Sequence, residues 1–179
     1  GLGYHQPASV LAAAGVGAAA TGETATKYVA RRMTPVFIAE NCTQCMDCIA
    51  SCPDTALPNT AQDAAAWLET AVKGYVSDAR ERATLLALVP SLESRLRAAM
   101  LEEIKAKRAT PFRDLLAREI EPLDVVTARA KREVLDIVAT LPIAYAKTNA
   151  TFASLERKSP GAGGLFAIFV SDLCKGCGE

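Results

Sequence analysis

The fold is decided by the stretch "NCTQCMDCIASCP", Asn41–Pro53, which holds four of the chain's six cysteines. These four are Cys42, Cys45, Cys48 and Cys52. They are separated by two, two and three residues and followed directly by a proline, which is the spacing of cysteines that bind iron–sulfur clusters in bacterial proteins. Thiolates are soft ligands that suit iron and sulfide. The stretch therefore predicts a loop folded around an iron–sulfur cluster.

A second cysteine motif is expected, because in proteins with two such clusters the fourth cysteine of the run reaches the other cluster. The last six residues, "CKGCGE", contain Cys174 and Cys177. The expected ligands are Cys42, Cys45 and Cys48 for one 4Fe-4S cluster, and Cys52, Cys174 and Cys177 for the other. Each cluster then finds three of its four ligands in this sequence.

The missing ligands are expected outside the given chain. The sequence stops one residue before a third cysteine would be due after Cys177, and it begins without a methionine. We therefore expect both ends to be cut from a longer protein, the iron–sulfur domain to be truncated at its C-terminus, and its ligand sets to be incomplete.

Other uses of six cysteines remain open from the spacing alone. Zinc accepts pairs of cysteines two residues apart, but structural zinc motifs rarely add a third cysteine at the same spacing and a fourth before a proline. Disulfides are disfavoured because thiols packed in a tight loop are poorly placed to pair, and no other feature suggests secretion. Inert cysteines at this spacing would be a coincidence.

Composition narrows the class of protein. The chain has 179 residues, of which 50% are hydrophobic and 22% charged, enough for one or two globular domains. Its 20 basic and 20 acidic residues balance, so charge gives no reason to expect nucleic acid or a membrane surface as a partner. The Ala- and Gly-rich stretch Val10–Gly22 is too short to span a membrane. The cytoplasm is the expected location.

The chain divides by composition into an arm and two structural parts. Residues 1–34 are small and polar and are expected to be a linker or arm. Residues 35–58 together with 165–179 are expected to form a ferredoxin-like iron–sulfur domain. Residues 59–164 are expected to be a mainly α-helical insertion. The expected fold class is thus α+β, a two-cluster ferredoxin-like domain split by a large helical insertion.

Each cysteine run is expected to lie on a loop after a short strand, Val36–Ile38 in one case and Leu165–Val170 in the other. Within the insertion, apolar residues recur every three or four positions, which predicts four or five amphipathic helices packed as hairpins or a bundle. The stripes are Leu85, Leu88, Val89, Leu92, Leu96 and Met100, and Leu123, Val126, Ala130, Val134, Ile137 and Leu141. Prolines that should start, stop or kink these helices are Pro90, Pro111, Pro122 and Pro142.

Other side chains give weaker signals. His5, the only histidine, is expected at the surface of the arm, and Trp67 is expected to pack a helix onto a neighbour. The acidic pairs Glu102–Glu103 and Glu119–Glu121 are expected to be solvated. The glycines of residues 161–164 lack the spacing of a phosphate-binding loop. No catalytic constellation is predicted.

Two long stretches resemble the pyruvate:ferredoxin (flavodoxin) oxidoreductase family, in the region of its two-cluster 4Fe-4S domain. The first, "TGETATKYVARRMTPVFIAENCTQCMDCIASCP", leads into the first cysteine motif, and the second, "TFASLERKSPGAGGLFAIFVSDLCKGCGE", leads into the other. The best matches to the family are Thr26, Lys27, Tyr28 and Arg31. The chain departs from the family at Ala30 and Arg32, and 121 residues separate Cys52 from Cys174, several times the usual insertion.

The resemblance implies a parent enzyme that oxidatively decarboxylates pyruvate or a related 2-oxoacid with thiamine diphosphate and coenzyme A, neither of which this segment would bind. Its clusters would relay electrons to ferredoxin or flavodoxin. The expected partners are the other domains of the parent, which is expected to be a homo-oligomer. This segment alone is not expected to be catalytic. An alternative is a ferredoxin-like electron-transfer subunit of another redox complex.

Overall fold

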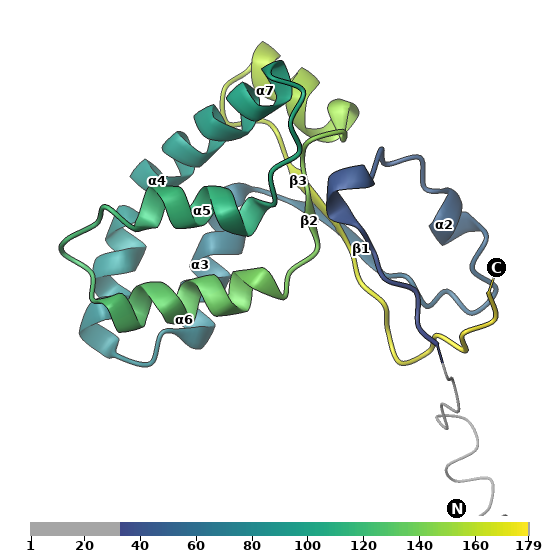
Figure 1. Ribbon diagram of the computed structural model, residues 1–179, viewed down its shortest axis with the longest axis horizontal. Helices are drawn as coiled ribbons and strands as arrows, with labels where there is room; N and C mark the ends of the chain where they lie inside the picture. The colour runs from purple at the N-terminus through teal and green to yellow at the C-terminus, as the bar shows by residue number, and fades with distance from the viewer. Residues whose placement is uncertain (1–32, 179) are drawn as a thin grey trace, which may run out of the picture.

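The computed structural model describes residues 33–178 and shows a mixed α and β architecture (Figure 1). The strands lie between a group of helices on the left of the view and the cysteine-bearing loops on the right. Most of the expected arm, including His5 and Val10–Gly22, lies outside the described residues. None of the helices within residues 33–178 is both long and apolar enough to cross a membrane.

A small antiparallel sheet connects the two sides of the molecule. Its strands are β1 (Asn59–Gln62), β2 (Ile143–Ala144) and β3 (Leu165–Ile168), in the order β1-β3-β2. All four residues of β3 are buried, as expected of a continuous apolar run in the centre of a sheet. The strand predicted before the second cysteine motif is thus confirmed.

The strand predicted at Val36–Ile38 is wrong. These residues belong to no strand, and they lead into a short 3₁₀ turn, η2 (Ala39–Asn41). Val36 is 84% exposed, so its apolar side chain is not part of the core. The position beside β3 is taken instead by β1, which follows the first cysteine run rather than preceding it.

The predicted helical block is confirmed. It comprises α3 (Ala64–Tyr75), α4 (Ala79–Lys105), α5 (Phe112–Ile120) and α6 (Ala128–Ala139). Each helix packs on the next, and α6 returns to contact α3, so the four close around one hydrophobic core. The predicted stripe on α4 faces this core, with Leu85, Val89, Leu92, Leu96 and Met100 all buried.

Three of the four prolines lie at helix boundaries. Pro111 directly precedes α5, Pro122 follows that helix, and Pro142 follows α6. Pro90 lies within α4, which continues on both sides of it. Pro90 is exposed, so water can reach the carbonyl that has lost its helical donor, while the flanking residues keep their core contacts.

The second apolar stripe does not form one helix. Thr127 caps α6, accepting a hydrogen bond from the Ala130 backbone N–H at 3.3 Å. Leu123 and Val126 therefore precede the helix, in the turn after α5, although Val126 is still buried. A Ser or Thr cap can set the start of a helix inside a run of regularly spaced apolar residues, because its side chain accepts a hydrogen bond from a backbone N–H that the first helical turn leaves unpaired.

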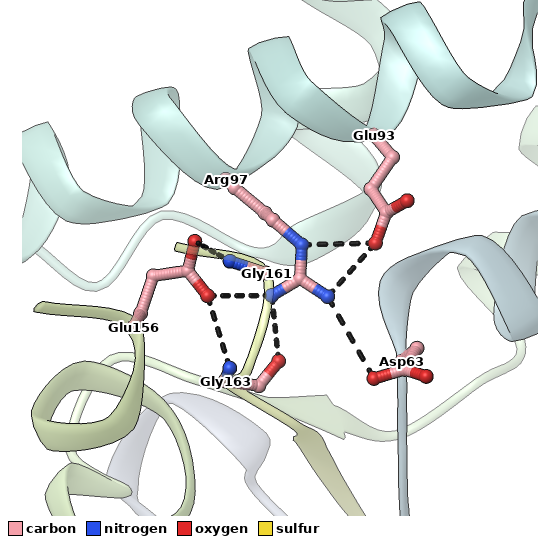
Figure 2. Close-up of polar contacts among 6 residues, drawn as sticks. All are labelled: Asp63, Glu93, Arg97, Glu156, Gly161 and Gly163. Atoms are coloured by element: carbon pink, nitrogen blue, oxygen red, sulfur yellow. Dashed lines mark hydrogen bonds and ion pairs between the residues drawn. The ribbon is translucent and has the colours of Figure 1, made fainter. Parts of the chain in front are cut away.

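A π-helical turn, η3 (Asn149–Ala153), and a short helix, α7 (Ser154–Lys158), connect β2 to the glycine-containing loop before β3. α7 ends at Lys158, directly before this loop. Glu156 of α7 is buried beside Arg97 of α4, with 2.7 Å between the Arg97 Nη1 and the Glu156 carboxylate (Figure 2). This ion pair fixes the end of α7 to the helical block.

The glycine loop closes around the same ion pair. The Glu156 carboxylate accepts hydrogen bonds from the backbone N–H groups of Gly161 and Gly163 at 2.9 and 3.0 Å, and Arg97 donates to the Gly163 carbonyl at 2.7 Å (Figure 2). A Cβ on Gly163 would lie 2.9 Å from Glu156 and from Phe152. The backbone of residue 163 lies so close to Glu156 and Phe152 that only glycine fits there. The glycine content of the loop therefore has a packing explanation.

Glu103 corrects the prediction that the acidic pairs are solvated. Its carboxylate is buried and accepts hydrogen bonds from Arg108, at 2.8 and 3.0 Å, and from Thr110. These hydrogen bonds, together with the positive charges of Arg108 and Arg118, lower the pKa of Glu103 to about 2. Its neighbour Glu102 remains at the surface, paired with Lys105.

Candidate metal centre

The first cysteine run forms a loop that turns tightly at two residues. Gln44 and Met46 have φ angles of 61° and 69°, in the left-handed region that non-glycine residues rarely adopt. After them the chain enters the one-turn helix α2 (Asp47–Ala50). Cys42, Cys45 and Cys52 lie on loop as predicted, whereas Cys48 lies within α2.

The first three thiols lie close enough to interact electrostatically. Burial raises the pKa of Cys42, and negative charge on Cys48 and Cys45 raises it further, while a hydrogen bond from the Gln44 backbone opposes the rise. Deprotonating one thiol therefore makes it harder to deprotonate its neighbours. A bound positive centre would offset that repulsion.

The sheet brings the second cysteine motif beside the first. Pairing of β1 with β3 continues beyond both strands, since the Phe169 N–H donates to the Pro58 carbonyl and the Ser171 N–H to the Ala56 carbonyl, both at 2.9 Å. At the end of this ladder the Ala56 N–H donates to the Cys52 sulfur at 3.3 Å. An antiparallel register thus sets the segment of Cys52 against the segment of Cys174.

These two segments enclose a pocket of about 460 Å³. The cysteines that line it are Cys48, Cys52, Cys174 and Cys177. The structure therefore brings together the three ligands expected for the second cluster, and Cys48 of the first set adjoins them. Cys42 and Cys45 do not line this pocket. Its other walls include apolar side chains such as Pro53 and Leu57, which would shield a bound group from water.

Within residues 33–178, no group of three or more His, Cys, Asp or Glu side chains is placed to hold a metal ion. Iron–sulfur clusters are held by cysteine thiolates together with their own iron and sulfide core. All six cysteines lie in the described part of the chain, and none forms a disulfide there.

Two contacts to the first cysteine loop could not be found from the sequence. The Lys147 ammonium donates to the Asn41 side chain at 3.0 Å, and the Thr151 hydroxyl donates to the Gln44 side chain at 2.6 Å. The partners are 106 and 107 residues apart in the chain, and single polar residues at such separations carry no local signal. The helical insertion thus reaches back to hold the loop that carries Cys42.

Comparisons with family models, curated proteins and solved structures found no match to this chain. Any functional conclusion therefore rests on the residues and geometry described above.

Proposed function

We propose that the chain is the electron-transfer segment of a 2-oxoacid:ferredoxin (flavodoxin) oxidoreductase, in which its cysteines hold 4Fe-4S clusters. The observation that carries the proposal is the pocket shared by Cys48, Cys52, Cys174 and Cys177, because cysteines 122 residues apart (174 minus 52) meet there. The resemblance described from the sequence supports the choice of pyruvate or a related 2-oxoacid as the source of electrons.

The chain's own residues have distinct parts in this proposal. Cys42, Cys45 and Cys48 hold one cluster, and Cys52, Cys174 and Cys177 the other. Each bound cluster supplies one-electron chemistry. The Ala56 N–H, which lies 3.3 Å from the Cys52 sulfur, stabilises negative charge there, and the apolar walls of the pocket limit access of water. Exposed Cys45 and Cys177 place the site near the surface, where a ferredoxin or flavodoxin could approach.

Anaerobic reconstitution with ferrous iron and sulfide, in the complete protein that carries this chain, tests the metal. We expect bound iron and acid-labile sulfide in equal amounts, and a paramagnetic signal after reduction with dithionite. Preferential uptake of zinc without iron would contradict the proposal. Ser51→Ala is a matched control, because Ser51 lines the same pocket without being a proposed ligand.

Paired substitutions test the ligand assignment. If Cys52 and Cys174 serve the same cluster, the Cys52→Ser and Cys174→Ser double variant should lose no more iron than either single variant. Combining Cys42→Ser with Cys174→Ser should remove both clusters. Additive iron loss in the first pair would show that Cys52 belongs with Cys42.

The source of electrons is tested in the complete protein that carries this chain. Addition of pyruvate or another 2-oxoacid with coenzyme A should reduce the clusters and then an added ferredoxin or flavodoxin. Clusters that dithionite reduces, but that no 2-oxoacid reduces, would instead favour a ferredoxin-like subunit of another redox complex.

A further inference from the structure

Thr151 connects the two cysteine-bearing segments of the molecule. It lies in the π-helical turn η3, within the insertion, and its hydroxyl donates to the Gln44 side-chain oxygen at 2.6 Å. Its backbone carbonyl accepts a hydrogen bond from Gly164 at 2.9 Å, directly before β3. One residue thus contacts the first cysteine loop and the start of the strand that leads to Cys174.

Gln44 is one of two residues in that loop, with Met46, whose backbone is strained. Its φ of 61° is a conformation that a side chain disfavours. Gln44 lies between Cys42 and Cys45, two of the ligands proposed for the first cluster. A side-chain anchor on Gln44 therefore holds the strained backbone between these two cysteines.

A second contact supports the same role for this part of the insertion. Lys147, four residues before Thr151, donates to Asn41, which directly precedes Cys42. Both contacts come from the connection between β2 and α7, and both reach the first cysteine loop on either side of Cys42.

We propose that Thr151 is a positioning residue for the first iron–sulfur site, acting through Gln44 to hold the loop that carries Cys42 and Cys45. As far as it concerns a bound cluster, this inference rests on the proposed function. The anchoring of Gln44 concerns the polypeptide alone and stands in the cluster-free protein as well.

The consequence for a bound cluster follows from the conformation of the loop. The potential of a cluster depends on the hydrogen bonds to its sulfurs and on its exposure to solvent, and the loop conformation sets both. Loosening Gln44 should therefore shift the potential of the first cluster. The second cluster, held by Cys52, Cys174 and Cys177, has its own amide donor at Ala56 and should change less.

Amide hydrogen exchange in the cluster-free full chain gives the first test. Thr151→Val removes the hydroxyl with little change in shape and should speed exchange of the loop amides at residues 42–46 by about fivefold, the effect of losing one ordinary hydrogen bond. Thr151→Ser should restore the wild-type rate. Thr70→Val is the matched control, because the exposed Thr70 hydroxyl bonds only within α3 as far as the structure shows. Equal exchange in Thr151→Val and wild type would overturn the proposal.

Redox titration of the reconstituted protein gives the second test. A fivefold change in the oxidised-to-reduced ratio corresponds to about 40 mV, given 59 mV per tenfold for one electron. We expect a shift of that size for one cluster in Thr151→Val, with Thr151→Ser close to wild type. Gln44→Met, which removes the acceptor instead of the donor, should reproduce the shift. Unchanged potentials in both Thr151→Val and Gln44→Met would overturn the potential-setting role.

The two tests separate failure of this inference from failure of the proposed function. If the complete protein that carries this chain takes up no iron, the proposed function fails, and hydrogen exchange alone decides whether Thr151 positions Gln44. If the wild type binds clusters but Thr151→Val changes neither exchange nor potential, the inference fails and the proposed function stands.

Discussion

The helical region, residues 59–168, and the cysteine segments, residues 33–58 and 169–178, are stabilised in different ways. Every buried residue of the hydrophobic core cluster lies in the helical region. In the cysteine segments the described buried residues are Ala39, Ala56 and Cys174, whereas Met33, Val36 and Leu173 are exposed. Figure 1 shows the same contrast, with closely packed helices on one side of the strands and open loops on the other.

The difference indicates where metal binding and folding are coupled. A region with its own core can fold without metal, whereas loops that bury little apolar surface depend on their ligand for order. The β1–β3 ladder belongs to the helical region and already holds Cys52 near Cys174. We therefore expect a folded scaffold that carries a metal-dependent pair of loops.

The largest expected effect comes from the core of the helical region. Leu96 is fully buried at the centre of α4, and Leu96→Ala should lower the free energy of unfolding by about 2–5 kcal/mol, since the cavity adds to the lost burial. Denaturant unfolding followed by Trp67 fluorescence measures it. Leu155→Ala is the control, because Leu155 is 41% exposed and should cost little. Equal effects of both would mean that the helical region lacks a well-packed core.

The buried ion pair of Arg97 and Glu156 should have the next largest effect. Arg97→Met leaves the Glu156 carboxylate buried without its partner, which costs about 3 kcal/mol in comparable cases. The double variant Arg97→Met with Glu156→Gln should recover part of that loss, because no buried charge remains. Denaturant unfolding of both variants measures it. A double variant less stable than Arg97→Met would show that the hydrogen bonds of Glu156 to the glycine loop matter more than its charge.

These two examples show what the sequence could and could not predict. The α4 core stripe and the β3 strand could be predicted, because each is a local pattern of apolar residues. The partners of Arg97 and Glu103 could not, because a charged residue on a predicted helix looks solvated until distant segments fold against it. The strand predicted at Val36–Ile38 was wrong because a local pattern was taken as sufficient. A short apolar run resembles a strand in sequence whether or not a neighbouring strand is present to pair with it.

For the candidate site, the sequence predicts the cysteines but not the contacts that support their loops. Cysteine spacing alone indicated Cys42, Cys45 and Cys48 as one set and Cys52 with the distant pair as another. Cys174 and Cys177 are brought close by the antiparallel ladder through Ala56. This ladder depends on β1, a polar strand with no strong sequence pattern. The contacts of Lys147 and Thr151 depend on tertiary packing and gave no local signal.

Removal of metal should affect the helical region and the cysteine segments differently. Chelation of the reconstituted protein should leave the far-ultraviolet circular dichroism of the helices nearly unchanged while the cysteine segments lose hydrogen-exchange protection. Limited proteolysis should then cut within residues 33–58 before any of the helices α3 to α6 is cut. Cooperative loss of helix and loops together would show that the helical region is not an independent scaffold.

The smallest expected effect is the acid response of Glu103 within the helical region. Its pKa of about 2 lies below the usual value near 4.5, so its hydrogen bonds and charge pairs stabilise the fold fully above about pH 4.5, and this contribution falls as the pH drops from there towards 2. Glu103→Gln should therefore be less stable than wild type at pH 7, and the gap should close by pH 2. Glu102→Gln, at the exposed neighbouring position, controls for loss of one surface charge. A constant gap between Glu103→Gln and wild type across this range would mean that the site depends on the shape of the side chain rather than on its charge, and the helical region would then owe its stability to packing alone.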